Sequence, residues 1–279
     1  MDMTDDKFLE KEELELDLLL AALHRLSGFD FRKYMRSSIM RRVQNRVRLE
    51  QLPNISRLTE EVINNEMLLQ KLLDDFSINV TEMFRDPAFF KAFREKVVPE
   101  LAEYPEIRIW HAGCSTGEEA YSMAILMEEE GLGEKVRIYA TDMSEKVIRK
   151  AEKGSIPISK MKAYTTNYML SGGKKSFSEY YSTDSECAYF DSKILRKIVF
   201  AQHNLVTDGS FNEFHIIICR NVLIYFNLEL QKHVLQLFNA SLADEGFLGI
   251  GSKESIRTEA YGHFEEFFFE EKIYRKMRA

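Results

Sequence analysis

The sequence predicts an α/β protein in two parts, an all-helical N-terminal region followed by a doubly wound, mostly parallel sheet. Apolar residues recur at helical spacing early in the chain, and no glycine occurs between Gly28 and Gly113, as suits helices. From Ile107 onward, short apolar runs alternate with helix-like stretches, which is typical of strands joined by crossover helices. One run, His215–Cys219, is almost wholly apolar, as expected of a strand covered on both faces.

Composition and charge narrow the class of protein. The 279 residues are 45% hydrophobic and include 20 phenylalanines, enough for a sizeable core in one large or two modest domains. The formal net charge of −7 disfavours nonspecific binding of nucleic acid. The 3 cysteines are widely spaced and form no cluster with histidines, so we expect reduced thiols, no metal site and a cytoplasmic location. We expect neither a signal peptide nor a membrane span, which needs roughly 20 apolar residues.

The N-terminal region is expected to hold several helices separated by short breaks. Leucines at helical spacing between Glu13 and Leu26 predict the first, which Gly28 ends. Leu52-Pro53-Asn54 is a second break. The other predicted helices are Arg32–Glu50, Ser56–Asn64 and Glu66–Phe76.

The second of these helices is strongly basic. Its cationic residues are Arg32, Lys33, Arg36, Arg41, Arg42, Arg46 and Arg48. A run of charges usually forms a solvated face. Because the rest of the chain is acidic, the cluster is local, and it could instead dock an acidic partner.

A polar segment, Asn79 to Pro87, leads into the sheet region. Asn79, Thr81 and Arg85 would make an odd core face, and Pro87 suits the first turn of a helix. A capped linker explains the segment equally well, and residue spacing alone does not decide between the two readings.

The sheet region is predicted from its apolar runs. The expected strands are Arg108–His111, Val136–Thr141, Lys197–Ala201, His215–Cys219 and Gly246–Gly251, with Lys272–Arg275 completing a final hairpin at one edge. The expected helices are Glu119–Glu130, Glu145–Lys153 and Leu228–Ala243. Asn167–Arg196 interrupts this alternation, and its Gly172-Gly173 pair indicates a loop or a small antiparallel excursion.

The most informative segment is Ile107 to Ser122, IRIWHAGCSTGEEAYS. It predicts a strand, a tight loop and a helix start, an arrangement that places backbone N–H groups around a ligand. A phosphate-binding loop carries Lys where this one has Glu118-Glu119. Two carboxylates would repel a pyrophosphate, which favours a nucleoside carrying an amine or a sulfonium, such as S-adenosylmethionine. An ordinary turn, with the acids complementing the helix dipole, is the alternative.

Three polar positions follow later strands. Asp142 could accept hydrogen bonds from ribose hydroxyls or cap the next helix. Asn204 could pair with adenine or serve as a turn residue. Arg220-Asn221 follows the almost wholly apolar strand, and Tyr225 lies a few residues further along the chain. Because ligands of open α/β sheets bind at the carboxyl ends of the strands, Tyr225 either points into that crevice or is a core residue.

Together these segments resemble the CheR family of chemotaxis methyltransferases, which methylate receptor glutamates. The resemblance covers most of the chain and rests on five segments in the family's order. They are NVTEMFRDP, IWHAGCSTGEEAYS, ATDMSEKVIRKAEKG, QHNL and IIICRNVLIYF. Each motif is weak alone, whereas five in order are highly specific.

The resemblance implies S-adenosylmethionine as cofactor, S-adenosylhomocysteine as product, and roles that follow from position. Arg85 and Tyr225 correspond to the pair beside the transferred methyl group. Glu119 corresponds to the acidic cofactor contact, and Asp142 to the ribose ligand. The other implied cofactor contacts are Asn79, Thr81, Arg85, Asn204, Leu205, Asn221 and Val222.

The resemblance also implies a domain plan and a partner. It divides the chain into a helical domain (1–86), a linker helix (87–105) and a Rossmann-like class I methyltransferase domain (106–279) with a small β-subdomain at approximately 165–198. The basic helix would dock on the acidic helical bundle of methyl-accepting receptors. The docking residues are Arg36, Arg41, Arg42 and Arg46. We expect a monomer that meets a membrane only through those receptors and binds no nucleic acid.

The sequence departs from the family pattern at two points. Ala120 stands where proline is common, which softens the helix start only. Lys174–Glu186 is longer than usual, which leaves docking of a receptor peptide on the β-subdomain an open question. Two other functions stay open as well, a methyltransferase for another protein or a small molecule and a non-catalytic module that senses the cofactor.

Overall fold

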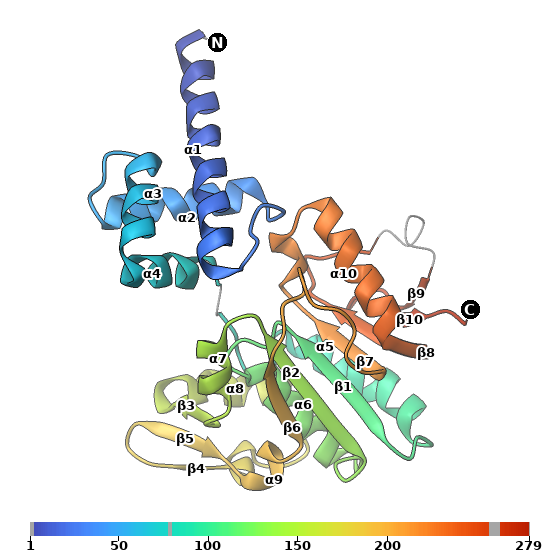
Figure 1. Cartoon of the computed structure of the whole chain (residues 1–279). Helices are drawn as coiled ribbons and strands as arrows, with labels where there is room; N and C mark the ends of the chain where they lie inside the picture. The colour runs from blue at the N-terminus through green and yellow to red at the C-terminus, as the bar shows by residue number, and fades with distance from the viewer. Residues whose placement is uncertain (1–2, 78–79, 257–262, 279) are drawn as a thin grey trace. The chain divides into compact units, whose positions relative to one another are not determined.

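The computed structural model describes residues 3–77, 80–256 and 263–278. The chain divides into two compact units, each described separately below (Figure 1). The helical unit comprises Met1–Ile78 and Ile224–Gln231, and the sheet unit comprises Asn79–Leu223 and Lys232–Ala279.

In the described part of residues 3–77, four amphipathic helices form the helical unit. They are α1 (Met3–Ser27), α2 (Arg36–Leu49), α3 (Ile55–Asn64) and α4 (Glu66–Phe76). Asn54 and Asn65 cap α3 and α4, since their side chains accept hydrogen bonds from Arg57 N (2.9 Å) and Leu68 N (3.3 Å). The first helix begins well before the predicted Glu13, because good helix formers continue it beyond its leucine stripe.

A short segment from late in the chain completes the helical unit. Met35 N donates to Tyr225 O (2.8 Å), and Asn227 N donates to Lys33 O (2.9 Å). The Tyr34 and Phe226 rings meet edge to face, with centroids 5.0 Å apart. This pairing holds Tyr34 in a β-bridge with Phe226, so α2 begins at Arg36 rather than at the predicted Arg32.

The sheet unit is built on a seven-stranded sheet of order β6-β2-β1-β7-β8-β10-β9 (Figure 1). The strands are β1 (Ile107–Ala112), β2 (Val136–Asp142), β6 (Ile198–Gln202), β7 (Phe214–Cys219), β8 (Leu242–Ile250), β9 (Phe264–Phe268) and β10 (Ile273–Lys276). The strands from β6 to β8 pair in parallel, whereas β10 runs antiparallel to both of its neighbours. The predicted doubly wound, mostly parallel sheet after a helical region is confirmed.

The predicted edge hairpin needs correction. β10 pairs with β8, but it lies inside the sheet, and the edge strand is β9. The sequence of β9, FEEFF, lacks the apolar alternation that identifies a strand. Its partner across a tight turn, rather than its own pattern, makes it a strand.

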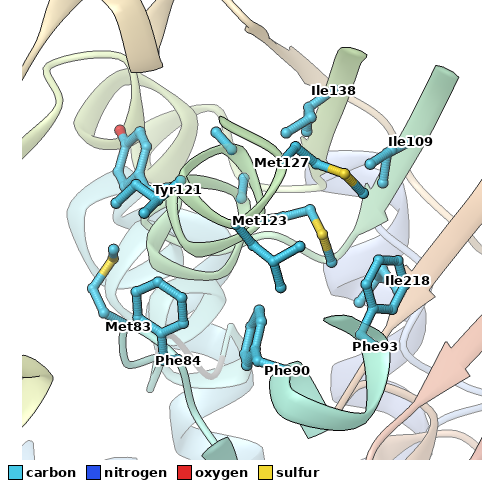
Figure 2. Close-up of a cluster of buried hydrophobic side chains, with 14 of the residues drawn as sticks. Met83, Phe84, Phe90, Phe93, Ile109, Tyr121, Met123, Met127, Ile138 and Ile218 are labelled. Atoms are coloured by element: carbon cyan, nitrogen blue, oxygen red, sulfur yellow. The ribbon is translucent and has the colours of Figure 1, made fainter. Parts of the chain in front are cut away.

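Helices cover both faces of the sheet. Ile109 and Ile218 point to the face covered by α5 (Pro87–Ala92) and α6 (Glu118–Glu129). Figure 2 shows Met123 and Met127 of α6 within this buried cluster, with Met127 beside Ile109. A π turn (Phe93–Val97) and a 3-10 turn (Val98–Leu101) follow α5.

The opposite face is covered by α10 (Leu228–Ser241). Trp110 points to this side, where its ring centroid lies 5.5 Å from that of Phe238. The side chains of alternate residues of β1 thus point to opposite faces of the sheet. His111, next along the strand, points back towards α6.

The segment that connects β2 to β6 in the sequence forms a three-stranded antiparallel sheet. Its order is β3 (Ser155–Pro157), β5 (Cys187–Phe190) and β4 (Tyr181–Thr183). It is accompanied by α7 (Glu145–Ala151), α8 (Ile158–Leu170) and α9 (Ser192–Leu195). The antiparallel excursion therefore starts near Ser155, earlier than the expected 165–198. The earlier start was not predicted because β3 is too short to leave a periodic signal in the sequence, and α8 was not predicted either.

Glu129 anchors this small sheet to the unit. Its carboxylate, fully buried, pairs with Arg94 (2.7 Å) and accepts hydrogen bonds from the Tyr180 hydroxyl (2.8 Å), the Tyr168 hydroxyl and Lys174 N.

Within the described residues, no helix is both long and apolar enough to cross a bilayer.

Candidate active site

The site lies where the direction of the sheet connections reverses. From β1 the chain proceeds to β2 and β6 on one side, while β7 and β8 lie on the other. Such a switch point leaves a crevice outside the carboxyl ends of the two central strands. Two loops border it, Gly113–Gly117 after β1 and Arg220–Val222 after β7. They touch, since a Cβ on Gly113 would lie 2.6 Å from Val222 Cγ2.

The loop after β1 is fixed by backbone hydrogen bonds. Gly113 N and Cys114 N both donate to Thr141 O at 2.8 Å. Gly113 and Gly117 have φ of +79° and +92°, which glycine adopts without strain. The loop therefore presents backbone rather than side chains to the crevice.

Asp142 joins this loop to the end of β2. Its Oδ2 accepts a hydrogen bond from Ser115 N and its Oδ1 one from Ser144 N, each at 3.0 Å. Burial raises the pKa of Asp142, although backbone N–H groups oppose the shift. The N-cap of α7 is Ser144. An ionised carboxylate offers about four lone-pair positions, so Asp142 keeps acceptor capacity for a ligand.

The acidic pair at the start of α6 splits into two environments. Glu119 lies 3.0 Å from His111 Nδ1 and 3.0 Å from Arg220 Nη1. Burial alone would raise the pKa of Glu119, but the His111 hydrogen bond and the Arg220 charge hold it below its usual value. Glu118 accepts a hydrogen bond from the Thr116 hydroxyl (2.6 Å), and burial raises its pKa. Glu119 is thus ionised at neutral pH, whereas burial works against ionisation of Glu118.

Arg220 links three segments of the site, a role that the sequence reading missed. Its guanidinium, with 1% of the side chain exposed, pairs with Asp86 (2.5 Å) and Glu119 (3.0 Å). It also donates to Arg85 O (3.1 Å) and lies 4.3 Å from the centroid of the Phe89 ring. The sequence did indicate this, because an arginine directly after a nearly continuous apolar run is expected to be buried and then needs partners.

The segment before α5 crosses this edge of the sheet. Phe84 N donates to Ser122 Oγ (2.8 Å), which ties the segment to α6. The Arg85 guanidinium donates to Val80 O (3.1 Å), and Thr81 O accepts from the Tyr164 hydroxyl (3.4 Å). Asn79, predicted beside them, lies outside the described residues.

Left-handed backbone gathers at this site. Among the described non-glycine residues with positive φ, Phe84 (51°), Asp86 (55°), Ser115 (51°) and Asn221 (62°) all lie in its segments. Asn221 is held by Glu254, whose Oε2 accepts from Asn221 N (3.0 Å) and Gly251 N (2.6 Å). Such conformations are costly and concentrate where function requires them.

Asn204 and Leu205 follow β6. Asn204 Oδ1 accepts from Val206 N (3.0 Å), and its own N–H donates to Asp208 Oδ2 (2.8 Å), so it forms a turn. Its carboxamide retains further donor and acceptor capacity. Leu205 is buried. The two readings of Asn204, turn residue and ligand contact, are therefore compatible.

Tyr225 belongs to the helical unit, with the basic helix. The guanidinium carbon of Arg42 lies 5.8 Å from the centroid of its ring. Arg42 also donates to Asp75 O (2.7 Å), and burial lowers the pKa of Arg42.

The four arginines expected to dock a partner fall into two groups. Arg36 pairs with Glu13 (2.6 Å) and Asp17 (2.7 Å). Arg46 pairs with Asp75 (2.7 Å) and Glu50 (2.9 Å). Their charges are thus compensated within the unit. Arg41 and Arg42 instead line a cavity of about 400 Å³, whose other lining residues are Asn45, Arg48 and Asp75.

Comparison with known proteins matches two family models to nearly the whole chain. Residues 79–273 match the CheR methyltransferase SAM-binding domain, and residues 14–77 match the CheR methyltransferase all-alpha domain.

Individual relatives match over comparable lengths. Cher3 of Pseudomonas putida is 44% identical over 95% of this chain and 97% of its own length. A chemotaxis protein methyltransferase of Borreliella burgdorferi is 29% identical over 87% of this chain and 88% of its own. Among solved structures, PKMT2 from Rickettsia typhi in complex with AdoHcy is 14% identical, with a TM-score of 0.32, over 52% of this chain and 21% of that one.

Proposed function

This chain is a member of the CheR methyltransferase family, and from that premise we propose that it methylates glutamate side chains of chemoreceptors. The product would be a glutamate methyl ester. Relatives from Borreliella burgdorferi and Listeria monocytogenes, each 29% identical, are named chemotaxis protein methyltransferases. The observation that carries the proposal is the arginine-lined cavity that shares a compact unit with Tyr225.

The residues of the crevice fit S-adenosylmethionine. Asp142 has acceptor capacity for ribose hydroxyls, and the ionised Glu119 suits the ammonium group. Gly113 lets the ligand approach the backbone closely. Asn204, Leu205, Asn221 and Val222 would complete the walls. When bound, S-adenosylmethionine supplies an electrophilic methyl group on a sulfonium sulfur.

The reaction requires little acid–base catalysis from the protein. A glutamate carboxylate, with a reference pKa of about 4.3, is already ionised at neutral pH and needs no general base. The protein must orient the acceptor oxygen towards the methyl carbon and exclude water. Alignment of this kind contributes roughly 7–11 kcal/mol in favourable cases. We assign Arg85 to hold the acceptor carboxylate and Tyr225 to position it.

The charge pattern of the helical unit supports an acidic acceptor protein. Arg41 and Arg42 border the cavity, while Arg36 and Arg46 are neutralised by neighbouring carboxylates. An acidic helix could place a carboxylate in the cavity while another reaches Tyr225. Electrostatic complementarity of this kind selects the partner and speeds encounter.

Transfer of labelled methyl to chemoreceptor fragments tests the proposal. We expect base-labile label that is released as methanol by mild alkali, which an ester gives and an N-methyl group does not. Arg85→Ala should abolish most transfer, while Arg149→Ala, an exposed change on α7, should not. Label that survives alkali would point to another acceptor. Binding of S-adenosylhomocysteine without any transfer would indicate a sensing module instead.

A further inference from the structure

We propose that His111 is a positioning residue for the cofactor site, and that its imidazole sets the Glu119 carboxylate to receive an ammonium group. This inference rests on the proposed function, because it takes Glu119 as the ligand of the cofactor's amine. It adds a residue to which the sequence analysis gave no role beyond the end of a predicted strand.

The geometry around His111 carries the proposal. Its side chain is fully buried near the carboxyl end of β1, on the face covered by α6. Nδ1 lies 3.0 Å from Glu119 Oε1. Since an ionised carboxylate only accepts hydrogen bonds, Nδ1 must carry the proton in this contact.

The two oxygens of Glu119 have different partners. Arg220 Nη1 donates to Oε2 (3.0 Å), and His111 holds Oε1. With one fixed donor on each oxygen, the carboxylate plane cannot rotate, and each oxygen keeps a lone pair for a ligand. Without His111, the carboxylate could turn so that both oxygens face the Arg220 fork, the geometry that arginine favours. Such a turn would withdraw it from the ligand.

The other ring nitrogen argues against a role in packing alone. His111 Nε2 is buried and has no hydrogen-bond partner within the described residues. A buried polar atom without a partner is costly. An apolar side chain would fill the same space without that cost. The imidazole is therefore explained by what Nδ1 does at Glu119.

Calorimetric titration of two ligands tests the inference. S-adenosylhomocysteine carries the ammonium group, whereas 5′-methylthioadenosine lacks the amino-acid part. We expect His111→Ala to weaken S-adenosylhomocysteine roughly tenfold, since a lost hydrogen bond to a charged group is worth about that factor. Affinity for 5′-methylthioadenosine should stay within about twofold. Equal losses for both ligands, or no loss for either, would overturn the inference.

A matched pair of amide variants tests which of the two ring nitrogens of His111 is required. The amide of His111→Asn reaches the position of Nδ1, while that of His111→Gln reaches the position of Nε2. Asn should retain most of the affinity for S-adenosylhomocysteine and Gln should not. Equal affinity of the two variants would count against the proposal, even if the alanine variant failed to fold.

A double-mutant cycle separates this inference from the proposed function. In a Glu119→Gln background, removal of His111 should cause no further loss. If the unaltered protein bound no S-adenosylhomocysteine, the cofactor assignment and this inference would both fail. If it bound the ligand while all His111 variants matched it, only the role of His111 would be refuted.

Discussion

At the level of single residues, the site depends on where buried charge is compensated. Arg220 pairs with Asp86 and Glu119 and donates to the backbone of Arg85. One guanidinium therefore connects the segment before α5, the start of α6 and the end of β7. The residue proposed to hold the acceptor, Arg85, is positioned through its own carbonyl oxygen.

Replacement of Arg220 should destabilise the protein severely. In Arg220→Met, Asp86 and Glu119 lose their buried partner, so we expect the free energy of unfolding to fall by about 3–5 kcal/mol. Arg220→Lys should recover little, because an ammonium cannot reproduce the planar fork. Urea denaturation measures the change. Arg149→Ala, whose ion pair with Glu145 is exposed, serves as the control and should unfold like the unaltered protein.

Asp142 should make cofactor binding sensitive to pH on the acid side. Its pKa is raised by burial while that of Glu119 is lowered. As pH falls, protonation of Asp142 removes acceptor capacity from the site, at a higher pH than for an ordinary aspartate. We expect the affinity for S-adenosylhomocysteine to fall through a pKa above the ordinary aspartate value of about 3.9. Titrations from neutral to acid pH should show this step, and Asp142→Asn should bind weakly without it.

The limits of sequence reasoning are clearest at Arg220 and His111. Motif position alone drew attention to Glu119 and Asp142, and the structure gives both distinct electrostatic surroundings. The side-chain partners of Glu119 are His111 on β1 and Arg220 directly after β7, and Arg220 lies 101 positions away in the sequence. No local pattern encodes such a contact, although burial of a charge after an apolar strand implies that a partner exists.

At the level of elements, the contact between two loops shapes the crevice. Gly113 has φ of +79°, and a Cβ there would meet Val222. Gly113→Ala should therefore weaken S-adenosylhomocysteine binding at least tenfold, measured by calorimetry, because it strains one loop and displaces the other. Gly131→Ala is the matched control, since Gly131 has φ of +75° but open space around it. It should cost stability without affecting affinity, and equal effects on affinity would refute the explanation.

The basic helix should govern recognition of the acceptor and not of the cofactor. Reversal of charge at Arg41 and Arg42 should raise the KM for a receptor fragment at least tenfold and leave the affinity for S-adenosylhomocysteine unchanged. Lys193→Glu places a reversed charge on the exposed surface of α9 and should leave both unchanged. Steady-state kinetics at two salt concentrations provides the measurement. An unchanged KM would exclude docking through the cavity.

Elements were predictable where a periodic pattern was long enough. The parallel strands are mostly apolar runs, and their predicted positions agree with the structure to within a few residues at most ends. β3 and β9 were missed for opposite reasons. β3 has three residues, too few for a period, and β9 mixes glutamates with phenylalanines. Both are strands because a neighbouring strand supplies their hydrogen bonds.

At the level of the whole molecule, the two compact units are not two consecutive stretches of sequence. Ile224–Gln231 belongs with the helices, so the chain passes between the units after residues 78, 223 and 231. Nothing in the run Leu223 to Gln231 indicates this, since it follows a strand and leads into α10. The long-range pairing of Tyr34 with Phe226 decides it. Tyr225, the proposed acceptor contact, therefore belongs to the helical unit, which also carries the proposed docking residues.

Because the helical unit includes Ile224–Gln231, we can predict whether the protein stays together after the chain is cleaved between the units. A protease site introduced at residues 78–79 would sever one of the three connections. The two fragments should still elute as one species in native size-exclusion chromatography, because Tyr225, Phe226 and Asn227 remain paired with residues 33–35. Phe226→Ala removes a buried ring, a loss of about 3–5 kcal/mol, and should release the helical fragment. Phe269→Ala, at an exposed position in the sheet unit, should not. Separation of the fragments without any substitution would show that the helices hold together without Ile224–Gln231. It would also show that Tyr225 is not part of the helical unit.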